Sequence, residues 1–311
     1  MNPKKASPSP FRKWLIAARP WALPASTMPV VFGTSLAVVV VGARLDVVRF
    51  AGAIFAMMIL HSAANMLSDV FDYRHGLDTQ VTPVSGAIVR GWLTDRQVLR
   101  GSAALFAAGI ALGLLLAWRT SWILLMIGAA GVVIGAGYTL LKVHALGDAA
   151  VFLNFGILGA LGAWVVQTRS FSWIPVVWTV PMAMLVSGIL HANNWRDIAA
   201  DSKCKIRTCA AVLGDRGSLR CYAFLLFGSQ VLVLIFIAFP LRNFGWPALP
   251  WSCLITLAAL PEALKLWGRA KRRHQPAAPL DFIVLDGATS RYNLHFGLLC
   301  VAGLWIAYFL K

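Results

Sequence analysis

Residues 50–78 read FAGAIFAMMILHSAANMLSDVFDYRHGLD, an apolar run that ends in a cluster of acidic side chains. From Phe50 to Ser68 the run carries no Asp, Glu, Lys or Arg, and about 20 mostly apolar residues are enough for a helix to cross a bilayer. At its end, Asn65, Asp69 and Asp72 follow one another at spacings of four and three residues, which places them on one face of a helix. The segment therefore predicts a membrane-spanning helix that carries carboxylates at one end.

The rest of the chain has the same character. Of its 311 residues, 59% are hydrophobic and 13% are charged, with a mean hydropathy of +0.72. A soluble domain carries about 25% charged residues, so these values exclude a soluble domain as well as a disordered chain. We predict an all-α, polytopic membrane protein of about nine transmembrane helices, which form one bundle around a central cavity open to the cytosolic face. The candidate spans are 22–41, 50–70, 99–117, 121–141, 147–167, 173–194, 220–240, 247–267 and 294–310.

The distribution of lysine and arginine predicts the orientation. With the N-terminus in the cytosol, 22 of the 28 basic residues fall on the cytosolic side and 6 on the other side, as the positive-inside rule requires. The net charge is +16. Because the basic residues that produce it lie between the apolar runs, they indicate anionic lipid rather than nucleic acid as the partner. We expect a cytosolic, partly disordered N-terminal segment, 1–20, a single membrane domain, 21–311, and long cytosolic loops at about 71–98, 195–219 and 268–293.

A second acidic stripe stands at the end of the sixth span. Asn193, Asp197 and Asp201 follow one another at spacings of four residues, and this stripe lies 128 residues after the first. The offset corresponds to four spans. Because four is an even number, the two helices run in the same direction through the membrane, and both acidic ends face the cytosol. The functional site is therefore expected on that face.

Grouped carboxylates at the edge of a bilayer repel one another and need a cation. Mg²⁺ prefers oxygen ligands and binds through one or two carboxylates together with substrate phosphates. Gly76 can end the second span, which lets Asp78 fold back near Asp72. The two stripes, with nearby cations, predict a site for a magnesium-bridged diphosphate; these cations are Arg74, Arg196, Lys203 and Arg207.

The cysteines and the intramembrane histidines suggest no second site. The five cysteines contain no CxxC pair and no spacing typical of zinc sites, so unpaired thiols are expected. His61 and His191 lie within predicted spans near the asparagines. Proton carriage or haem ligation are conceivable there, but hydrogen-bonded interior histidines are the favoured interpretation.

The two acidic segments resemble the UbiA superfamily of intramembrane prenyltransferases, and most closely its 1,4-dihydroxy-2-naphthoate branch in menaquinone synthesis. Residues 69–78, DVFDYRHGLD, resemble the first Asp-rich motif, and residues 193–203, NNWRDIAADSK, resemble the second. Arg19-Pro20-Trp21 resembles the beginning of the first span in that branch. Two departures are visible: Ser68 precedes Asp69 where the family usually has Asn, and 204–206 lacks the small Gly that the family has after the second motif.

The resemblance implies transfer of a polyprenyl group from polyprenyl diphosphate to an aromatic acid, with Mg²⁺ as cofactor, in a bacterial inner membrane. No obligate protein partner is expected. The roles are distributed as follows: metal ligands Asp69, Asp72, Asp197 and Asp201; diphosphate-binding residues Asn65, Asn194, Lys203, Arg207 and Arg74; acceptor-binding or carbocation-stabilising residues Asp78, Tyr138 and Lys142.

Two alternatives remain open at this point. Another acceptor, such as hydroxybenzoate, homogentisate, a porphyrin or a phenol of secondary metabolism, would suit the same motifs. A membrane transporter with the Asp clusters as a cation site is the alternative from another class. A transporter predicts ionisable residues deep in the spans, whereas the spans here are almost free of them.

Overall fold

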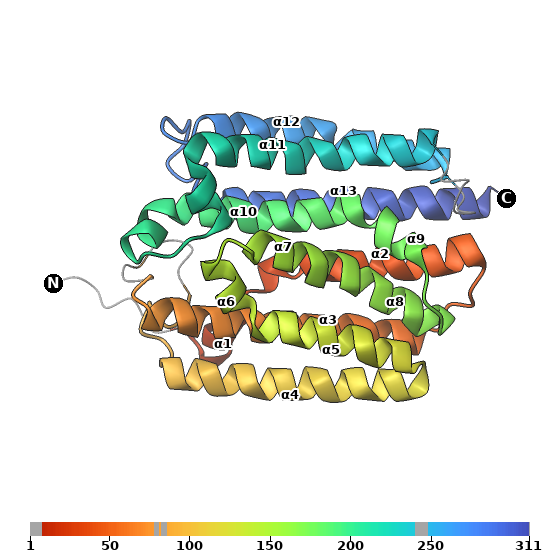
Figure 1. Cartoon of the computed structure of the whole chain (residues 1–311), viewed down its shortest axis with the longest axis horizontal. Coiled ribbons are helices and arrows are strands. Elements are labelled where there is room, and N and C mark those ends of the chain that lie inside the picture. The colour runs from red at the N-terminus through yellow and green to blue at the C-terminus, as the bar shows by residue number, and fades with distance from the viewer. Residues whose placement is uncertain (1–7, 78–80, 82–85, 240–247, 311) are drawn as a thin grey trace.

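The computed structural model describes residues 8–77, 81, 86–239 and 248–310. These residues form a bundle of long helices that run side by side, and the described part contains no strand (Figure 1). In chain order the elements are α1 (Pro10–Ala18), η1 (Pro20–Ala22), α2 (Pro24–Val41), α3 (Val47–Arg74), α4 (Asp95–Arg119), α5 (Trp122–Ala136), α6 (Tyr138–Val143), α7 (Gly147–Val151), η2 (Phe152–Leu158), α8 (Gly159–Thr168), α9 (Trp173–Trp178), α10 (Val180–Lys203), α11 (Cys209–Ala238), η4 (Trp251–Ala259), α12 (Leu260–Lys271) and α13 (Leu285–Phe309).

The predicted fold class, an all-α polytopic membrane protein, is confirmed. Six described helical segments are long and apolar enough to cross a membrane: α2, α3, α4, the continuous segment Gly147–Thr168, α11 and α13. In the apolar 18-residue stretch of α3, only 17% of the residues are buried inside the protein, and in that of α4 only 11% are. Surfaces this apolar are compatible with lipid and not with water. The number of nine spans is not confirmed, because α5 is shorter, and α10 and η4–α12 do not meet the same criteria.

Two of the predicted loops are wrong in extent. The chain between α10 and α11 is only 204–208, not 195–219, and the connection between α12 and α13 is 272–284, not 268–293. The helices continue beyond the apolar residues that a hydropathy window detects, because polar side chains at the end of α10 find partners within the protein, as Asp197 does with Arg196 and Asp201 with Thr208. The acidic motifs therefore lie on rigid helix ends rather than in loops.

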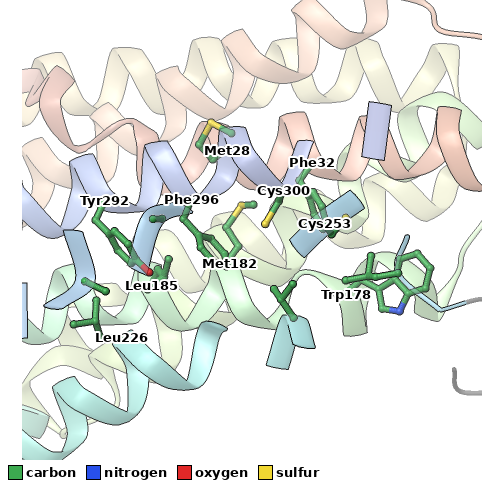
Figure 2. Packing of buried hydrophobic residues seen from close by; sticks show 14 of the residues in the cluster. Met28, Phe32, Trp178, Met182, Leu185, Leu226, Cys253, Tyr292, Phe296 and Cys300 are labelled. Carbon is green, nitrogen blue, oxygen red and sulfur yellow. The ribbon is translucent and has the colours of Figure 1, made fainter. Parts of the chain in front are cut away.

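The main hydrophobic core fills the space between α2, α10, α11, η4 and α13. Figure 2 shows Met28, Phe32, Met182, Leu185 and Phe296 within this cluster. All five side chains are at most 3% exposed. The core holds α10 against α11 and α13, and it thereby fixes the position of the second acidic stripe.

Two helical segments depart from regular geometry. In α11, Gly214 has a φ of 64° and a ψ of −175°, which breaks the helix one turn after its start. Between α7 and α8, residues 152–158 form the π-helical segment η2, a wider helix type that is often found at functional sites.

A close approach of α2 and α8 depends on a glycine. A Cβ at Gly33 would lie 2.2 Å from the carbonyl oxygen of Ala160, so Gly33→Ala is expected to lower stability by about 1–3 kcal/mol through overpacking. Thermal unfolding in detergent measures the effect. Gly268→Ala on α12, where nothing lies within 4 Å of the new Cβ, is the matched control and should leave the melting temperature unchanged or higher. Equal melting temperatures for both variants would contradict the prediction.

Candidate active site

The acidic ends of α3 and α10 lie at the same end of the bundle (Figure 1). Gly76, with a φ of +72°, terminates the turn after α3, as its position in the sequence predicted. The thiol of Cys204, just after α10, donates to the carbonyl oxygen of Gly76 at 3.5 Å. Two segments that are 128 residues apart in the chain are thus in direct contact, as the parallel arrangement of the stripes requires.

A polar cavity lies between these helix ends. It encloses about 1020 Å³ of space, including its opening to solvent. Its polar lining comes from Arg19, just before η1, and from α3, α6, η2, α10 and α13. The polar residues are Arg19, His61, Asn65, Ser68, Asp72, Tyr138, Lys142, Asn154, Asn193, Asp286 and Ser290. Both stripes contribute to one cavity, through Asn65 and Asp72 on one side and Asn193 on the other.

Asp72 and Lys142 form the central ion pair of this cavity. The ammonium group of Lys142 donates to both carboxylate oxygens of Asp72, at 3.0 and 3.1 Å. Lys142 is 8% exposed. Burial alone would lower the pKa of Lys142, but the adjacent Asp72 carboxylate holds that pKa above its ordinary value. Lys142 therefore remains a cation beside the Asp72 side chain.

Asp69 is buried, does not line the cavity itself, and pairs with Arg19, which does. The backbone of Gly86 lies against the Asp69 carboxylate, because a Cβ at Gly86 would lie 2.5 Å from Oδ2. Arg19 adopts a left-handed φ of 53° between α1 and η1. The sequence singled out Arg19 for its resemblance to a family motif but assigned it no role, and a contact 50 residues apart leaves no signal in helical spacing.

The second stripe is held by a network centred on Arg196. The guanidinium group of Arg196 donates to both oxygens of Asp197 at 2.8 Å and to Asp286 at 2.9 Å. Asn193 also donates to Asp286, at 3.0 Å. Asp286 lines the cavity from α13 and was not among the predicted residues, since it belongs to neither acidic stripe.

The remaining predicted residues occupy different positions around the cavity. Asp201 is buried and accepts a hydrogen bond from Thr208 at 3.1 Å. Asn194 is also buried, and its amide donates to Asp148 at 3.4 Å rather than facing the cavity. Arg74 pairs with Asp95 on the surface. Lys203 and Arg207 are exposed at the same end, and Asp78 lies outside the described residues.

The two intramembrane histidines are hydrogen-bonded, as the sequence favoured. His61 lines the cavity, and its Nδ1 lies 2.8 Å from the hydroxyl of Ser26. His191 is fully buried and bonds Asp148.

An apolar groove continues from the polar cavity. Ala64, Gly135, Asn154 and Phe155 line both spaces. The groove encloses about 1400 Å³, including its open side, between α3, α4, α5 and α8. Its walls are almost entirely aliphatic and glycine residues, for example Leu60, Gly109, Gly128 and Gly162. One end of the combined space thus suits a charged group, and the other suits a long hydrocarbon.

The polar cavity has the donor set for a hard cation bound together with an anion. Carboxylate oxygens of Asp72 and Asp286 line it, and Asp197 and Asp201 stand nearby on α10. In addition, the Nδ2 amide group of Asn65 is buried without a hydrogen-bond partner among the described residues. A buried donor without a partner is costly, and a phosphate oxygen is a suitable acceptor for it. These residues therefore fit magnesium with a diphosphate.

Comparison with known sequences identifies the relatives of this chain. The sequence model of the UbiA prenyltransferase family matches residues 26–285. A 1,4-dihydroxy-2-naphthoate octaprenyltransferase of Bacillus subtilis is 29% identical over 296 residues, which cover 94% of this chain and 91% of the relative. The UbiA prenyltransferase domain-containing protein 1 of Danio rerio is 30% identical over 300 residues, which cover 94% and 84%.

Solved structures show the same fold. A UbiA homolog from Archaeoglobus fulgidus, determined with bound DMAPP and Mg²⁺, aligns with a TM-score of 0.62 at 13% identity and covers 93% of this chain and 99% of its own. A homolog from Aeropyrum pernix K1, in its apo form, aligns with a TM-score of 0.58 at 18% identity, with coverages of 91% and 97%. At these identities the likeness concerns the helical arrangement alone.

Proposed function

The chain belongs to the UbiA prenyltransferase family, and we propose that within this family it transfers a polyprenyl group from polyprenyl diphosphate to 1,4-dihydroxy-2-naphthoate in a magnesium-dependent reaction. As a family member it is an integral-membrane prenyltransferase, and the transporter alternative falls away. The observation that carries the proposal is the continuity of the polar cavity with the apolar groove through Ala64, Gly135, Asn154 and Phe155. A prenyl diphosphate has the same division into a charged head and an apolar tail.

We assign the diphosphate head to the polar cavity. Asp69, Asp72, Asp197 and Asp201 would hold magnesium, which supplies the positive charge that stabilises the departing diphosphate. Asn65, which lines the cavity, would position phosphate or metal-bound water, whereas Asn194, expected in the same role, is buried against Asp148 and is left out of this assignment. The cations at this end of the bundle would neutralise the remaining phosphate oxygens; they are Lys203, Arg207 and Arg74. Asp78 is proposed to act with the first stripe or to orient the acceptor.

The chain's own residues then protect the reacting carbon. When the bond to the diphosphate oxygen breaks, the allylic carbon becomes cationic and must be kept from water until the aromatic ring attacks it. The ring of Tyr138, on the cavity wall, would stabilise that carbon through its π face. Lys142, which remains cationic beside Asp72, would bind the carboxylate of the acceptor or the diphosphate. The apolar groove would bind the polyprenyl tail.

The acceptor assignment rests on the resemblance of the Asp-rich motifs and on the Bacillus subtilis relative. We place the N-terminus and the cavity on the cytosolic side of a bacterial inner membrane, because 22 of the 28 basic residues lie on that side in this orientation.

An acceptor panel tests the proposal. Protein purified in detergent is given octaprenyl diphosphate, Mg²⁺ and, in separate reactions, 1,4-dihydroxy-2-naphthoate, hydroxybenzoate or homogentisate. We expect a prenylated product with dihydroxynaphthoate and at most trace product with the others, because a cavity of fixed shape discriminates acceptors by their transition-state contacts. Mass spectrometry identifies the product, and chelation of the metal with EDTA should abolish it. Turnover with hydroxybenzoate alone would overturn the acceptor assignment.

A further inference from the structure

The imidazole of His61 lies where the polar cavity meets the apolar groove. His61 lines the polar cavity from α3 and is 4% exposed. Its ring packs against that of Phe155, with 4.2 Å between the ring centroids. Phe155, as well as Ala64 on the next turn of α3, lines both spaces. The bond that breaks in a prenyl diphosphate joins the charged head to the apolar tail, so His61 stands beside the region in which that bond would lie.

The hydrogen bonds of the imidazole leave one ring nitrogen available. Nδ1 lies 2.8 Å from the hydroxyl oxygen of Ser26, and the same hydroxyl group donates to the carbonyl oxygen of Leu23 at 3.2 Å. Ser26 can therefore accept from Nδ1–H while it donates to Leu23. The neutral imidazole then carries its lone pair on Nε2, and within the described part of the chain Nε2 makes no hydrogen bond.

The carboxylates of the cavity are already engaged by cations. Among the described residues that line it, the carboxylates are Asp72 and Asp286. Asp72 accepts two hydrogen bonds from Lys142, and Asp286 accepts one from Arg196 at 2.9 Å. Transfer of a proton to either carboxylate would weaken an ion pair, whereas transfer to Nε2 of His61 would weaken none.

We propose that His61 is the catalytic base of the prenyl transfer and that its Nε2 takes the proton of the acceptor's ring hydroxyl group; this inference rests on the proposed function. Loss of that proton makes the hydroxyl oxygen a stronger electron donor to the ring. An electron pair of the ring then forms the new carbon–carbon bond, and the bond from the allylic carbon to the diphosphate oxygen breaks, with its electron pair leaving on the diphosphate.

The remaining steps return His61 to its starting form. The attacked ring carbon gives up its original substituent, either a proton or a carboxylate that leaves as carbon dioxide, and the electron pair of that bond restores the aromatic ring. His61 then gives its proton back to the ring oxygen. A positioned base of this kind contributes about 10²–10⁴-fold to a rate.

A glutamine variant tests the role in catalysis. Glutamine can still hydrogen-bond the Ser26 hydroxyl but cannot take up a proton, so His61→Gln should lower kcat for octaprenyl diphosphate and dihydroxynaphthoate about 10²–10³-fold. The affinity for prenyl diphosphate and the KM for the acceptor should change by less than about threefold, because the loss is confined to the transition state. His295→Gln removes an exposed histidine of α13 outside both spaces and should retain wild-type turnover.

Two further measurements separate a missing base from a packing defect. Imidazole added to His61→Ala should raise its turnover at least about tenfold, because a free base can enter the space of the lost ring, whereas Asp72→Asn should not respond. In addition, a ring-fluorinated dihydroxynaphthoate has a more acidic hydroxyl group and depends less on a base. The ratio of wild-type to His61→Gln turnover should therefore be smaller for this acceptor.

The outcomes that overturn the proposal are distinct from those that overturn the proposed function. A kcat for His61→Gln within about threefold of the wild type would show that another group, such as the departing diphosphate, takes the proton. A loss that neither imidazole nor the more acidic acceptor reduces would assign His61 to packing. The proposed function is judged from wild-type turnover alone: if the wild type prenylated another phenol instead, the acceptor assignment would fail, and the ratio for His61→Gln would be measured on that phenol.

Discussion

Asp72→Asn is expected to reduce turnover about 10²–10³-fold, the range seen when one preorganised electrostatic group of an active site is removed. Asp72 faces the polar cavity and carries the charge that Lys142 neutralises in the structure. Asparagine keeps the shape of the side chain but removes the negative charge on which magnesium binding would depend. Steady-state rates with saturating prenyl diphosphate measure the effect, and added Mg²⁺ should restore part of the loss if the metal is bound more weakly.

The control for this experiment is another carboxylate at the same end of the bundle. Asp95 pairs with Arg74 on the surface and does not line the cavity, so Asp95→Asn should retain near-normal turnover. Asp72→Asn leaves Lys142 buried without its ion-pair partner, and such a loss destabilises by about 3–5 kcal/mol. The double variant Asp72→Asn/Lys142→Met removes that cost. If activity returned in the double variant, the defect would be one of stability and the role proposed for Asp72 would be wrong.

Gly128→Phe is expected to shorten the prenyl chain that the enzyme accepts. Gly128 lines the apolar groove on α5, and nothing lies within 4 Å of a Cβ built there. It is seven residues, or about 10 Å along the helix, from Gly135 at the junction with the polar cavity. A phenyl ring there would displace the tail beyond that point. Loss of one buried five-carbon unit costs roughly 4 kcal/mol at about 0.8 kcal/mol per carbon, so kcat/KM for octaprenyl diphosphate should fall about 10²–10³-fold.

The matched measurement uses geranyl diphosphate, whose tail is short enough to end before the ring. Its kcat/KM should change by less than about threefold, because the polar cavity is untouched. Gly268→Phe, an open glycine on α12 outside both spaces, should leave both substrates unaffected. If the two substrates lost activity equally in Gly128→Phe, the groove would not be the tail site.

The elements that were predictable from sequence are those governed by local periodicity. The apolar run of residues 50–68 and the spacing of Asn65, Asp69 and Asp72 led to a spanning helix with an acidic end, and α3 has that form. The resemblance named the family, and the family model matches most of the chain. The helix ends were less predictable, since the charged side chains of 195–203 interrupt the apolar run and the segment still remains helical.

The partners of the acidic residues were not predictable in the same way. Arg19 pairs with Asp69 and Asp286 pairs with Arg196 across 50 and 90 residues, and such pairs are set by tertiary packing rather than by spacing. Asn194 is a different case: the resemblance assigned it to diphosphate binding, but in the structure it is buried against Asp148.

Because η2 is π-helical, the number of residues between α7 and α8 affects how α8 is oriented. A π turn accommodates a residue more than the α-helical ladder does, and removal of one residue from 152–158 would restore an unbroken α-helix. Everything after the deletion would then rotate by about 100° relative to α7, which would carry the groove-facing residues of α8 away from the junction at Asn154 and Phe155. A three-nucleotide deletion in these codons is thus expected to be far less tolerated than one in a surface connection, and natural variation should preserve the segment's length more strictly than its residue identities.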